Sequence, residues 1–266
     1  MSTPLPYRPP SVDPQVDLDL SKNEGWPPPL PPLPEGLGTL SRRYPETGDL
    51  RRAVARRHGV KTDRVFLTAG GDDALFRCLL SLRGGRAVAT APSFQMIPIY
   101  ANQTGVSLTQ VPWWSGPFPT EEFITVGEGA EMAVIVSPNN PTGATIDGTD
   151  LRRIAGAFSR VVLDTAYAEF ADEDLTPLAL ELDNVVVIRT LSKAFGLAGL
   201  RVGYLLGPAG EVSRISSYGS PYPISGPAAS LATEVLSDVG PGELPFVAAV
   251  RQERHDLEEL LEELGA

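Results

Sequence analysis

A lysine in the second half of the chain stands out by its type and its place. The chain has 22 lysine and arginine residues, of which three are lysines, so its cationic side chains are mostly arginines. Lys193 follows the apolar run Val185–Ile188 and precedes a small, glycine-containing segment. An amine that must lose its proton and attack a carbonyl group can only be a lysine, because arginine stays protonated. This segment alone fits a nucleophilic amine and an ordinary surface lysine equally well.

Three other loops carry polar residues that could bind a ligand. Asp164 ends the apolar run Val161–Leu163, where a buried carboxylate needs a partner. A protonated pyridine nitrogen would be such a partner and would make its ring an electron sink, whereas a helix cap or a structural ion pair is the alternative. The turn at 137–143 offers two asparagine amides as donors, and the helix start at 70–72 has free N–H groups that suit a phosphate. Each pattern is common, so none decides the chemistry alone.

The elements that position these loops alternate between strands and helices. Runs of strand length are Val65–Leu67, Ala87–Ala89, Met132–Val136, Val161–Leu163 and Val185–Ile188. Helical patterns cover Asp49–His58, Asp72–Leu82 and Thr149–Phe158, the last with Thr149 as its predicted N-cap. Continuous apolar strands between amphipathic helices predict an α/β protein, a three-layer sandwich with a mainly parallel sheet. Ligands of such sheets bind beyond the carboxyl ends of the strands, where the polar loops lie.

The overall composition argues against several classes of function. The net charge of −11 and the sequence pI of about 4.7 disfavour nucleic-acid and anionic-membrane partners, which need basic patches. Cys78 is expected to be a buried structural thiol, and His58 and His255 are expected on the solvated surface, so no metal site is predicted. The N-terminus lacks a signal-peptide pattern and the apolar runs are too short to span a bilayer, which predicts a cytoplasmic protein.

Three motifs in a fixed order give the chain a family likeness. They are Ser-Pro-Asn-Asn-Pro-Thr-Gly at 137–143, Asp164-x-x-Tyr167, and Ser192-Lys193 with Arg201 eight residues after the lysine. Together they resemble the fold-type I aminotransferases that depend on pyridoxal 5′-phosphate (PLP), with the closest likeness to the histidinol-phosphate aminotransferase branch. Further support comes from Leu20–Glu24, Arg43–Glu46 and Ser220–Ser225. The resemblance runs from about residue 18 to the end of the chain and implies the large domain of the PLP-dependent transferase fold.

The resemblance implies roles for the residues around the reacting end of the cofactor. Lys193 would form the Schiff base with PLP and then move the proton between the substrate Cα and the cofactor C4′. Asp164 would pair with the pyridine nitrogen, while Tyr167 and Asn140 would hydrogen-bond the ring O3′. Phe94 takes the position that stacks on the ring, where the family more often has tyrosine. Stacking needs only an aromatic face, so this change is mild.

A second set of residues would hold the cofactor phosphate. The resemblance assigns this role to the backbone amides of Gly71 and Asp72, the Ser192 hydroxyl and the Arg201 guanidinium. Tyr44 would reach the phosphate of the neighbouring subunit, which implies a homodimer with shared sites.

The resemblance also implies a division of the chain. Residues 1–40 form a proline-rich arm, 41–240 the PLP-binding large domain, and 241–266 a helix leading toward a truncated small domain. Within the arm, Pro27–Pro34 fits either a polyproline II ligand or an extended segment on the protein's own surface. The chain ends shortly after the acidic amphipathic pattern Val250–Leu264, whereas the family continues into a small domain. That domain supplies the arginine that grips the substrate carboxylate, a role for which this chain offers no candidate.

The implied activity is transfer of an amino group between an amino donor and a 2-oxo acid or a phosphorylated imidazole ketone. Amino acids and 2-oxo acids are therefore the expected small-molecule partners. A threonine-phosphate decarboxylase-like activity would use the same cofactor residues, and a PLP-binding protein without catalysis is the third possibility. The early chain end fits a fragment, a natural short form whose substrate-binding groups come from elsewhere, such as another subunit, or a non-catalytic relative.

Overall fold

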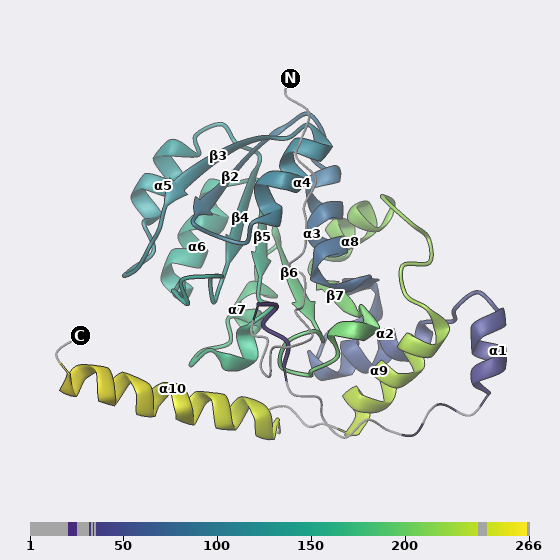
Figure 1. Cartoon of the computed structure of the whole chain (residues 1–266). Helices are drawn as coiled ribbons and strands as arrows, with labels where there is room; N and C mark the ends of the chain where they lie inside the picture. The colour runs from purple at the N-terminus through teal and green to yellow at the C-terminus, as the bar shows by residue number, and fades with distance from the viewer. Residues whose placement is uncertain (1–20, 26–31, 33, 35, 239–243, 265–266) are drawn as a thin grey trace.

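A computed structural model describes residues 21–25, 32, 34, 36–238 and 244–264. Within these residues the core is a seven-stranded sheet of order β1-β7-β6-β5-β4-β2-β3 (Figure 1). Its strands are β1 Val65–Thr68, β2 Arg86–Ala91, β3 Ser107–Pro112, β4 Met132–Val136, β5 Arg160–Asp164, β6 Val185–Thr190 and β7 Gly203–Leu206. Strand β7 is antiparallel to both of its neighbours, and the other pairs are parallel. The predicted mainly parallel sheet is confirmed.

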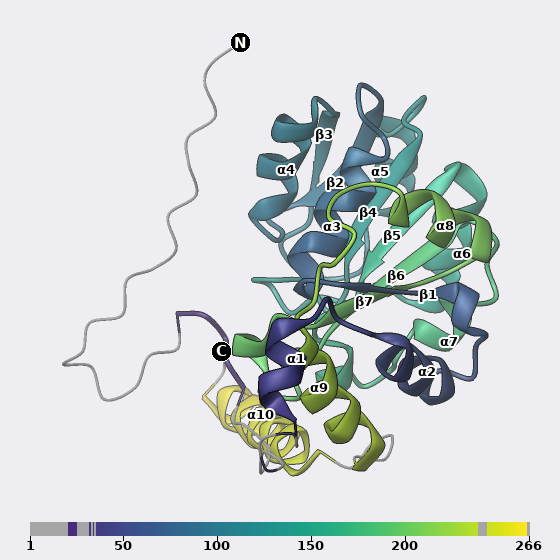
Figure 2. The same cartoon turned by 90° about the vertical axis from the view of Figure 1, so that its right-hand side faces the viewer.

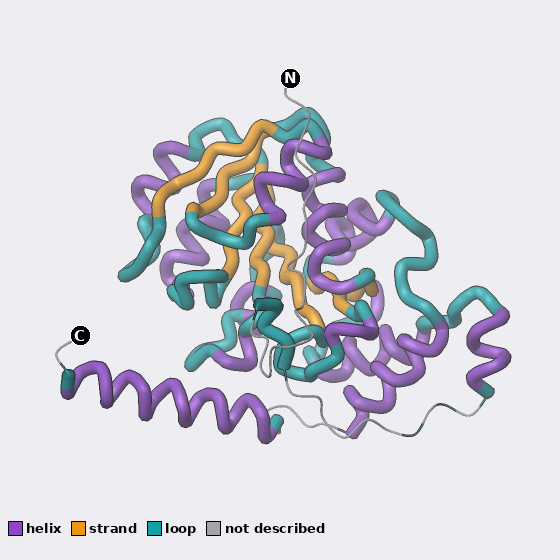
Figure 3. The backbone as a smooth tube through the Cα atoms, viewed as in Figure 1, coloured by secondary structure: helices purple, strands orange, loops and turns teal. Residues whose placement is uncertain are grey.

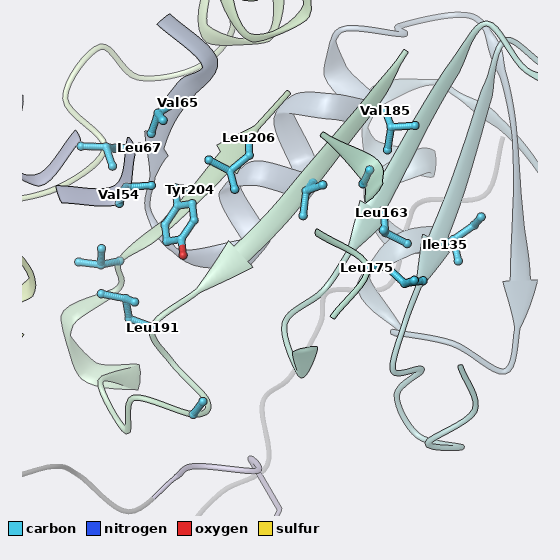
Figure 4. Close-up of a cluster of buried hydrophobic side chains, with 14 of the residues drawn as sticks. Val54, Val65, Leu67, Ile135, Leu163, Leu175, Val185, Leu191, Tyr204 and Leu206 are labelled. Atoms are coloured by element: carbon cyan, nitrogen blue, oxygen red, sulfur yellow. The ribbon is translucent and has the colours of Figure 1, made fainter. Parts of the chain in front are cut away.

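Successive residues of the central strands point to opposite faces of the sheet, and both faces are buried. In β5, Val161 and Leu163 belong to one apolar cluster and Val162 belongs to the other. Figure 4 shows part of the first cluster. Helices α2 Gly48–Arg57, α5 Thr120–Val126, α6 Gly148–Ala157, α7 Thr176–Ala179 and α9 Gly226–Asp238 contribute to the first cluster or flank it. The second cluster is covered by α3 Gly70–Leu80, α4 Met96–Thr104 and α8 Ala209–Ser216. The three-layer sandwich is therefore confirmed.

Two strands were not predicted from the sequence, and one helix cap was predicted at the wrong residue. Strand β3 lies at the edge of the sheet and is largely exposed, and the short β7 follows the loop after Lys193. Neither has the long apolar run that marks the central strands. The predicted Thr149 cap is wrong, because α6 begins at Gly148 and the Asp147 side chain accepts from Asp150 N at 2.8 Å.

Helix α10, Pro245–Glu263, lies outside the three layers (Figure 1 and Figure 2). Within the described residues, it joins the buried core at its start, through Val247 in its first turn and through Leu244 just before it. Leu257, Leu260, Leu261 and Leu264 are exposed along its second half. The helix predicted over Val250–Leu264 is confirmed, with an earlier start. A short helix, α1 Leu37–Arg42, lies at the other end of the described chain.

The predicted division at residues 40 and 240 stays a prediction, and most of the proline run at 27–34 lies outside the described residues. Among the helices that the structure describes, none has the length and apolar character needed to cross a membrane.

His58 contradicts the expectation of a solvated surface residue. It follows the last residue of α2 and turns inward, where its Nε2 lies 3.0 Å from the Tyr204 hydroxyl. Burial, with help from the nearby Arg189 and Arg57 charges, lowers the His58 pKa to about 3, so the ring is neutral. The charged residues around it in the sequence suggested a solvated side chain, because they give no sign of the contact with Tyr204. His255 is exposed as expected, and Cys78 is fully buried with a pKa raised by burial to about 12.

Candidate functional site

The loops at the carboxyl ends of β4, β5 and β6 meet the start of α3 around one cavity of about 740 Å³. Figure 3 shows these loops crowded at one end of the sheet. The cavity is lined by nine of the ten residues predicted for the site: Gly71, Asp72, Phe94, Asn140, Asp164, Tyr167, Ser192, Lys193 and Arg201. Residues chosen from the sequence thus lie around one cavity, because parallel strands bring their carboxyl ends to one edge of the sheet.

Asp164 lines this cavity. It is the last residue of β5, only 5% exposed, and Ala166 N donates to its Oδ1 at 3.0 Å. Burial raises the Asp164 pKa to about 7, and the negative charge of Asp72 adds to the rise. The Ala166 hydrogen bond and the Lys193 charge oppose it. A buried carboxyl that lacks a close cationic partner among the described residues suits a protonated nitrogen on a bound ring.

Lys193 projects into the same cavity from the loop after β6. Its Nζ donates to the carbonyl oxygens of Lys22 at 2.8 Å and Asn23 at 3.3 Å. It also lies 5.6 Å from the centroid of the Tyr167 ring. Burial lowers the Lys193 pKa, while the carboxylates of Asp72 and Glu24 oppose that shift. A lowered pKa increases the fraction of neutral amine, which is the nucleophilic form.

The start of α3 and Arg201 line the same cavity. Gly70 has φ of +80°, and a side chain there would place its Cβ 2.7 Å from Arg201 Nη2. The positive φ favours glycine at this position, and a side chain here would displace the Arg201 guanidinium. Arg201 pairs with Asp72 at 2.9 Å and donates to Ser192 Oγ at 3.4 Å. The first turn of an eleven-residue helix, a hydroxyl and a guanidinium thus line the same cavity, and such groups can bind an anion.

The two adjacent asparagines of the 137–143 turn have different surroundings. Asn139 is buried and its amide is committed to the turn, donating to Pro92 O at 3.0 Å and to Thr142 Oγ1 at 2.8 Å. Ser93 Oγ donates to the Asn139 side-chain oxygen at 2.8 Å. Asn140 lines the cavity instead. Of the two amides expected to face a ligand, the structure therefore brings one to the site.

Tyr44 is the predicted site residue that the structure leaves outside its own chain's cavity. Its side chain is 78% exposed and stacks on Tyr222, with ring centroids 4.6 Å apart. The Arg43–Glu46 and Ser220–Ser225 motifs therefore meet in space. The homodimer and a contribution of Tyr44 to a neighbouring site stay predictions.

Two residues of the site were not singled out from the sequence. Thr190 Oγ1 donates to Ser192 Oγ at 3.0 Å and accepts from Ser192 N at 3.1 Å, which fixes the loop before Lys193. Asn23 Nδ2 donates to the Tyr167 hydroxyl oxygen at 3.2 Å. Asn23 lies in Leu20–Glu24, one of the stretches that carried the family resemblance, and Thr190 stands two residues before the Ser192-Lys193 pair.

The buried Arg189, in β6, holds the segment that follows β5. It pairs with Glu169, contacts the Asp174 carboxylate at 3.2 Å and donates to Thr176 Oγ1 at 2.9 Å. Arg189 is 3% exposed, and its pKa is raised by the two carboxylates against the effect of burial. This cluster supports the segment that carries Tyr167 from the side opposite the cavity.

Comparison with known proteins places the chain in a family. The sequence model of the family "Aminotransferase class I and II" matches residues 34–265. The chain belongs to this aminotransferase family. Over 240 residues it is 32% identical to a histidinol-phosphate aminotransferase of Pyrococcus furiosus, a match that covers 87% of this chain and 70% of that protein.

Two solved structures share the fold with this member of the aminotransferase family. The histidinol-phosphate aminotransferase of Sinorhizobium meliloti, determined with pyridoxal 5′-phosphate, has a TM-score of 0.72 and 26% identity, covering 82% of this chain and 63% of that one. The L-threonine-O-3-phosphate decarboxylase of Porphyromonas gingivalis has a TM-score of 0.67 and 25% identity, covering 76% and 62%. The chain thus spans less than two thirds of the length of both structures.

Proposed function

We propose that this chain is the PLP-binding part of an aminotransferase similar to the histidinol-phosphate aminotransferases. The observation that carries the proposal is the arrangement of Lys193, Asp164 and Arg201 around one cavity. An amine, a buried carboxyl and an anion-binding helix start are the three groups that PLP needs at its aldehyde, its ring nitrogen and its phosphate. The family membership and the Sinorhizobium structure support the same cofactor.

The residues present fit this cofactor. Asp164, with a pKa near 7 when alone, would ionise beside a protonated pyridine nitrogen and would keep that nitrogen charged. When bound, PLP supplies the electron sink that accepts the electron pair left on the substrate Cα. Arg201, Ser192 and the N–H groups at the start of α3 would hold the phosphate.

The chain's own side chains would then bind, orient and move one proton. Lys193 Nζ would hold the cofactor, and after release from it would carry the proton from the substrate Cα. Tyr167 and Asn140 would hydrogen-bond the ring oxygen next to the reacting carbon, and Phe94 would stack on the ring. We expect an amino acid as donor and a 2-oxo acid or a phosphorylated imidazole ketone as acceptor.

The test is a reduction and transamination experiment on the purified chain. Incubation with PLP should give a yellow protein, and borohydride followed by peptide mass spectrometry should find the cofactor attached to Lys193. Lys193→Ala is the matched control and should show no adduct. Amino acids should bleach the visible band and 2-oxo acids should restore it. A colourless wild-type protein without an adduct at Lys193 contradicts the proposal.

A decarboxylase is the second candidate, because the Porphyromonas gingivalis decarboxylase shares the fold at a similar identity. Threonine phosphate would then release carbon dioxide without transferring its amino group to a 2-oxo acid. A PLP adduct at Lys193 that no amino acid bleaches would instead indicate a binding protein without turnover.

The proposal includes a homodimer in which Tyr44 reaches the neighbouring phosphate site. The exposure of Tyr44, stacked on Tyr222, supports it. Light scattering should give twice the chain mass, and Tyr44→Ala should weaken PLP binding although Tyr44 lies outside its own cavity. A monomer that binds PLP normally contradicts this part.

A further inference from the structure

A short segment near the start of the chain lines the cavity. We call residues 21–25 the strap; four of its five residues, Ser21 to Glu24, line the cavity. At its end, Gly25 lies so close to Lys193 that an added Cβ would overlap the Lys193 carbonyl oxygen. The same Cβ would lie 3.0 Å from the Phe246 ring. Packing between Lys193 and α10 therefore fixes the position of the strap.

Asn23 combines an unusual backbone conformation with a hydrogen bond from its side chain to Tyr167. Its φ is +50°, the left-handed region that asparagine tolerates better than most residues. Although the residue is exposed, its Nδ2 donates to the Tyr167 hydroxyl oxygen at 3.2 Å, across 144 positions of sequence. The backbone carbonyls of Lys22 and Asn23 accept from Lys193 Nζ. The strap thus contacts both the Tyr167 hydroxyl and Lys193 Nζ.

We propose that Asn23 is a positioning residue that directs the hydroxyl proton of Tyr167 into the cavity. The Asn23 amide donates, so the phenol oxygen accepts on that side and its own proton must point elsewhere. The open direction is the cavity shared with Asn140 and Lys193. Because the role of that cavity rests on the proposed function, the test below also measures Tyr167 without any cofactor.

The charges around Tyr167 agree with this arrangement. Burial raises the Tyr167 pKa, the Asn23 amide opposes the rise, and the Asp164 carboxylate adds to it. The Lys193 ammonium lies 5.6 Å from the ring centroid. A donor to the phenol oxygen stabilises the phenolate, whereas an acceptor at the same place would stabilise the neutral phenol.

The experiment is a titration of Tyr167 in the cofactor-free protein, followed by the ultraviolet absorbance of the phenolate. Subtracting the curve of the same protein with Tyr167→Phe isolates this tyrosine. Asn23→Ala should move the midpoint of Tyr167 to higher pH, because the donor is lost. Asn23→Asp keeps the shape but replaces the donor with a charged acceptor, so it should move the midpoint further in the same direction. Asn102→Ala, which removes an exposed asparagine from α4, is the matched control and should leave it in place.

The same variants should also affect cofactor binding. Loss of one positioned hydrogen bond should weaken PLP binding about two- to tenfold in Asn23→Ala. An unchanged Tyr167 titration in both Asn23 variants overturns the inference, whether or not PLP binds. A shifted titration in a protein that never binds PLP supports the inference and contradicts the proposed function, so the two failures are distinct.

Discussion

Arg201 Nη2 lies 2.9 Å from the carboxylate of Asp72, so the arginine predicted to bind a phosphate already holds an anion. Both side chains are nearly half exposed, at 48% and 43%. An exposed ion pair of this kind contributes about 1 kcal/mol at most. A dianionic phosphate, held in addition by helix N–H groups and Ser192, can therefore compete with Asp72 for the guanidinium.

Arg201→Met should weaken PLP binding about ten- to a hundredfold, because it removes a charge-assisted hydrogen bond of about 1.5–3 kcal/mol. The thermal midpoint of the cofactor-free protein should change little, since the lost pair with Asp72 is exposed. Titration of the cofactor-free protein with PLP, followed by fluorescence, measures the effect. Unchanged affinity would contradict the assignment of Arg201 to the phosphate.

Asp72→Asn tests the competing side of the same contact. The backbone N–H of residue 72 stays in place, while the carboxylate that competes for Arg201 is removed. Affinity for PLP should rise by about two- to fivefold, which corresponds to an exposed pair worth up to 1 kcal/mol. A fall in affinity would show instead that Asp72 orients Arg201 for the phosphate.

Asp164→Asn should stabilise the cofactor-free protein and impair the cofactor-bound one. Burial raises the Asp164 pKa from 3.8 to about 7, so the folded protein keeps a proton that the unfolded chain releases. Below about pH 4 both states are protonated and the group has no effect, and the folded state loses stability as pH rises toward about 7. The full loss is about 4 kcal/mol at most.

Thermal unfolding of the wild type and Asp164→Asn at several pH values checks this expectation. The two proteins should have similar midpoints near pH 4, and the variant should be more stable near pH 8. With PLP bound, the difference in thermal midpoint near pH 8 should shrink or change sign, because the ionised carboxylate of Asp164 then has a cationic partner. A wild type that is more stable than the variant at high pH without cofactor would contradict the raised pKa.

The parts of the fold and site that depend on local sequence could be predicted, and those that depend on distant contacts could not. Met132–Val136 is apolar at every position because both faces of β4 are buried, and its bounds were predicted correctly. Edge strand β3 has one buried residue in six and leaves no such signal. In the same way, the histidine next to the charged end of α2 looked solvated, although the contact with Tyr204 buries it.

The site shows the same division. Asp164 ends β5, Tyr167 follows it and Lys193 follows β6, so the rule for parallel sheets was enough to place all three at one edge of the sheet. The contact from Asn23 to Tyr167 spans 144 positions, and its donor lies on an irregular segment. Such a contact depends on how the strap packs beside Lys193, which no spacing in the sequence encodes.

Arg189→Met should destabilise the fold by about 3–5 kcal/mol, because it leaves a largely buried carboxylate on Glu169 without its cation. The free energy of unfolding from urea titration measures this loss. Arg153→Ala is the control, since it removes an exposed partner of Glu121 and should leave the free energy of unfolding almost unchanged. Equal effects of the two substitutions would contradict a supporting role for Arg189.

Gly25→Ala should displace the strap without removing any polar side chain of the site. The new Cβ would overlap the Lys193 carbonyl oxygen, and neither backbone can yield without moving its segment. We expect weaker PLP binding and the same upward shift of the Tyr167 titration as in Asn23→Ala, because the Asn23 amide moves away. Gly210→Ala is the control: nothing lies within 4 Å of the added Cβ in α8, and the helix should gain up to about 1 kcal/mol. If Gly25→Ala changes neither PLP binding nor the Tyr167 titration, the strap does not position the site.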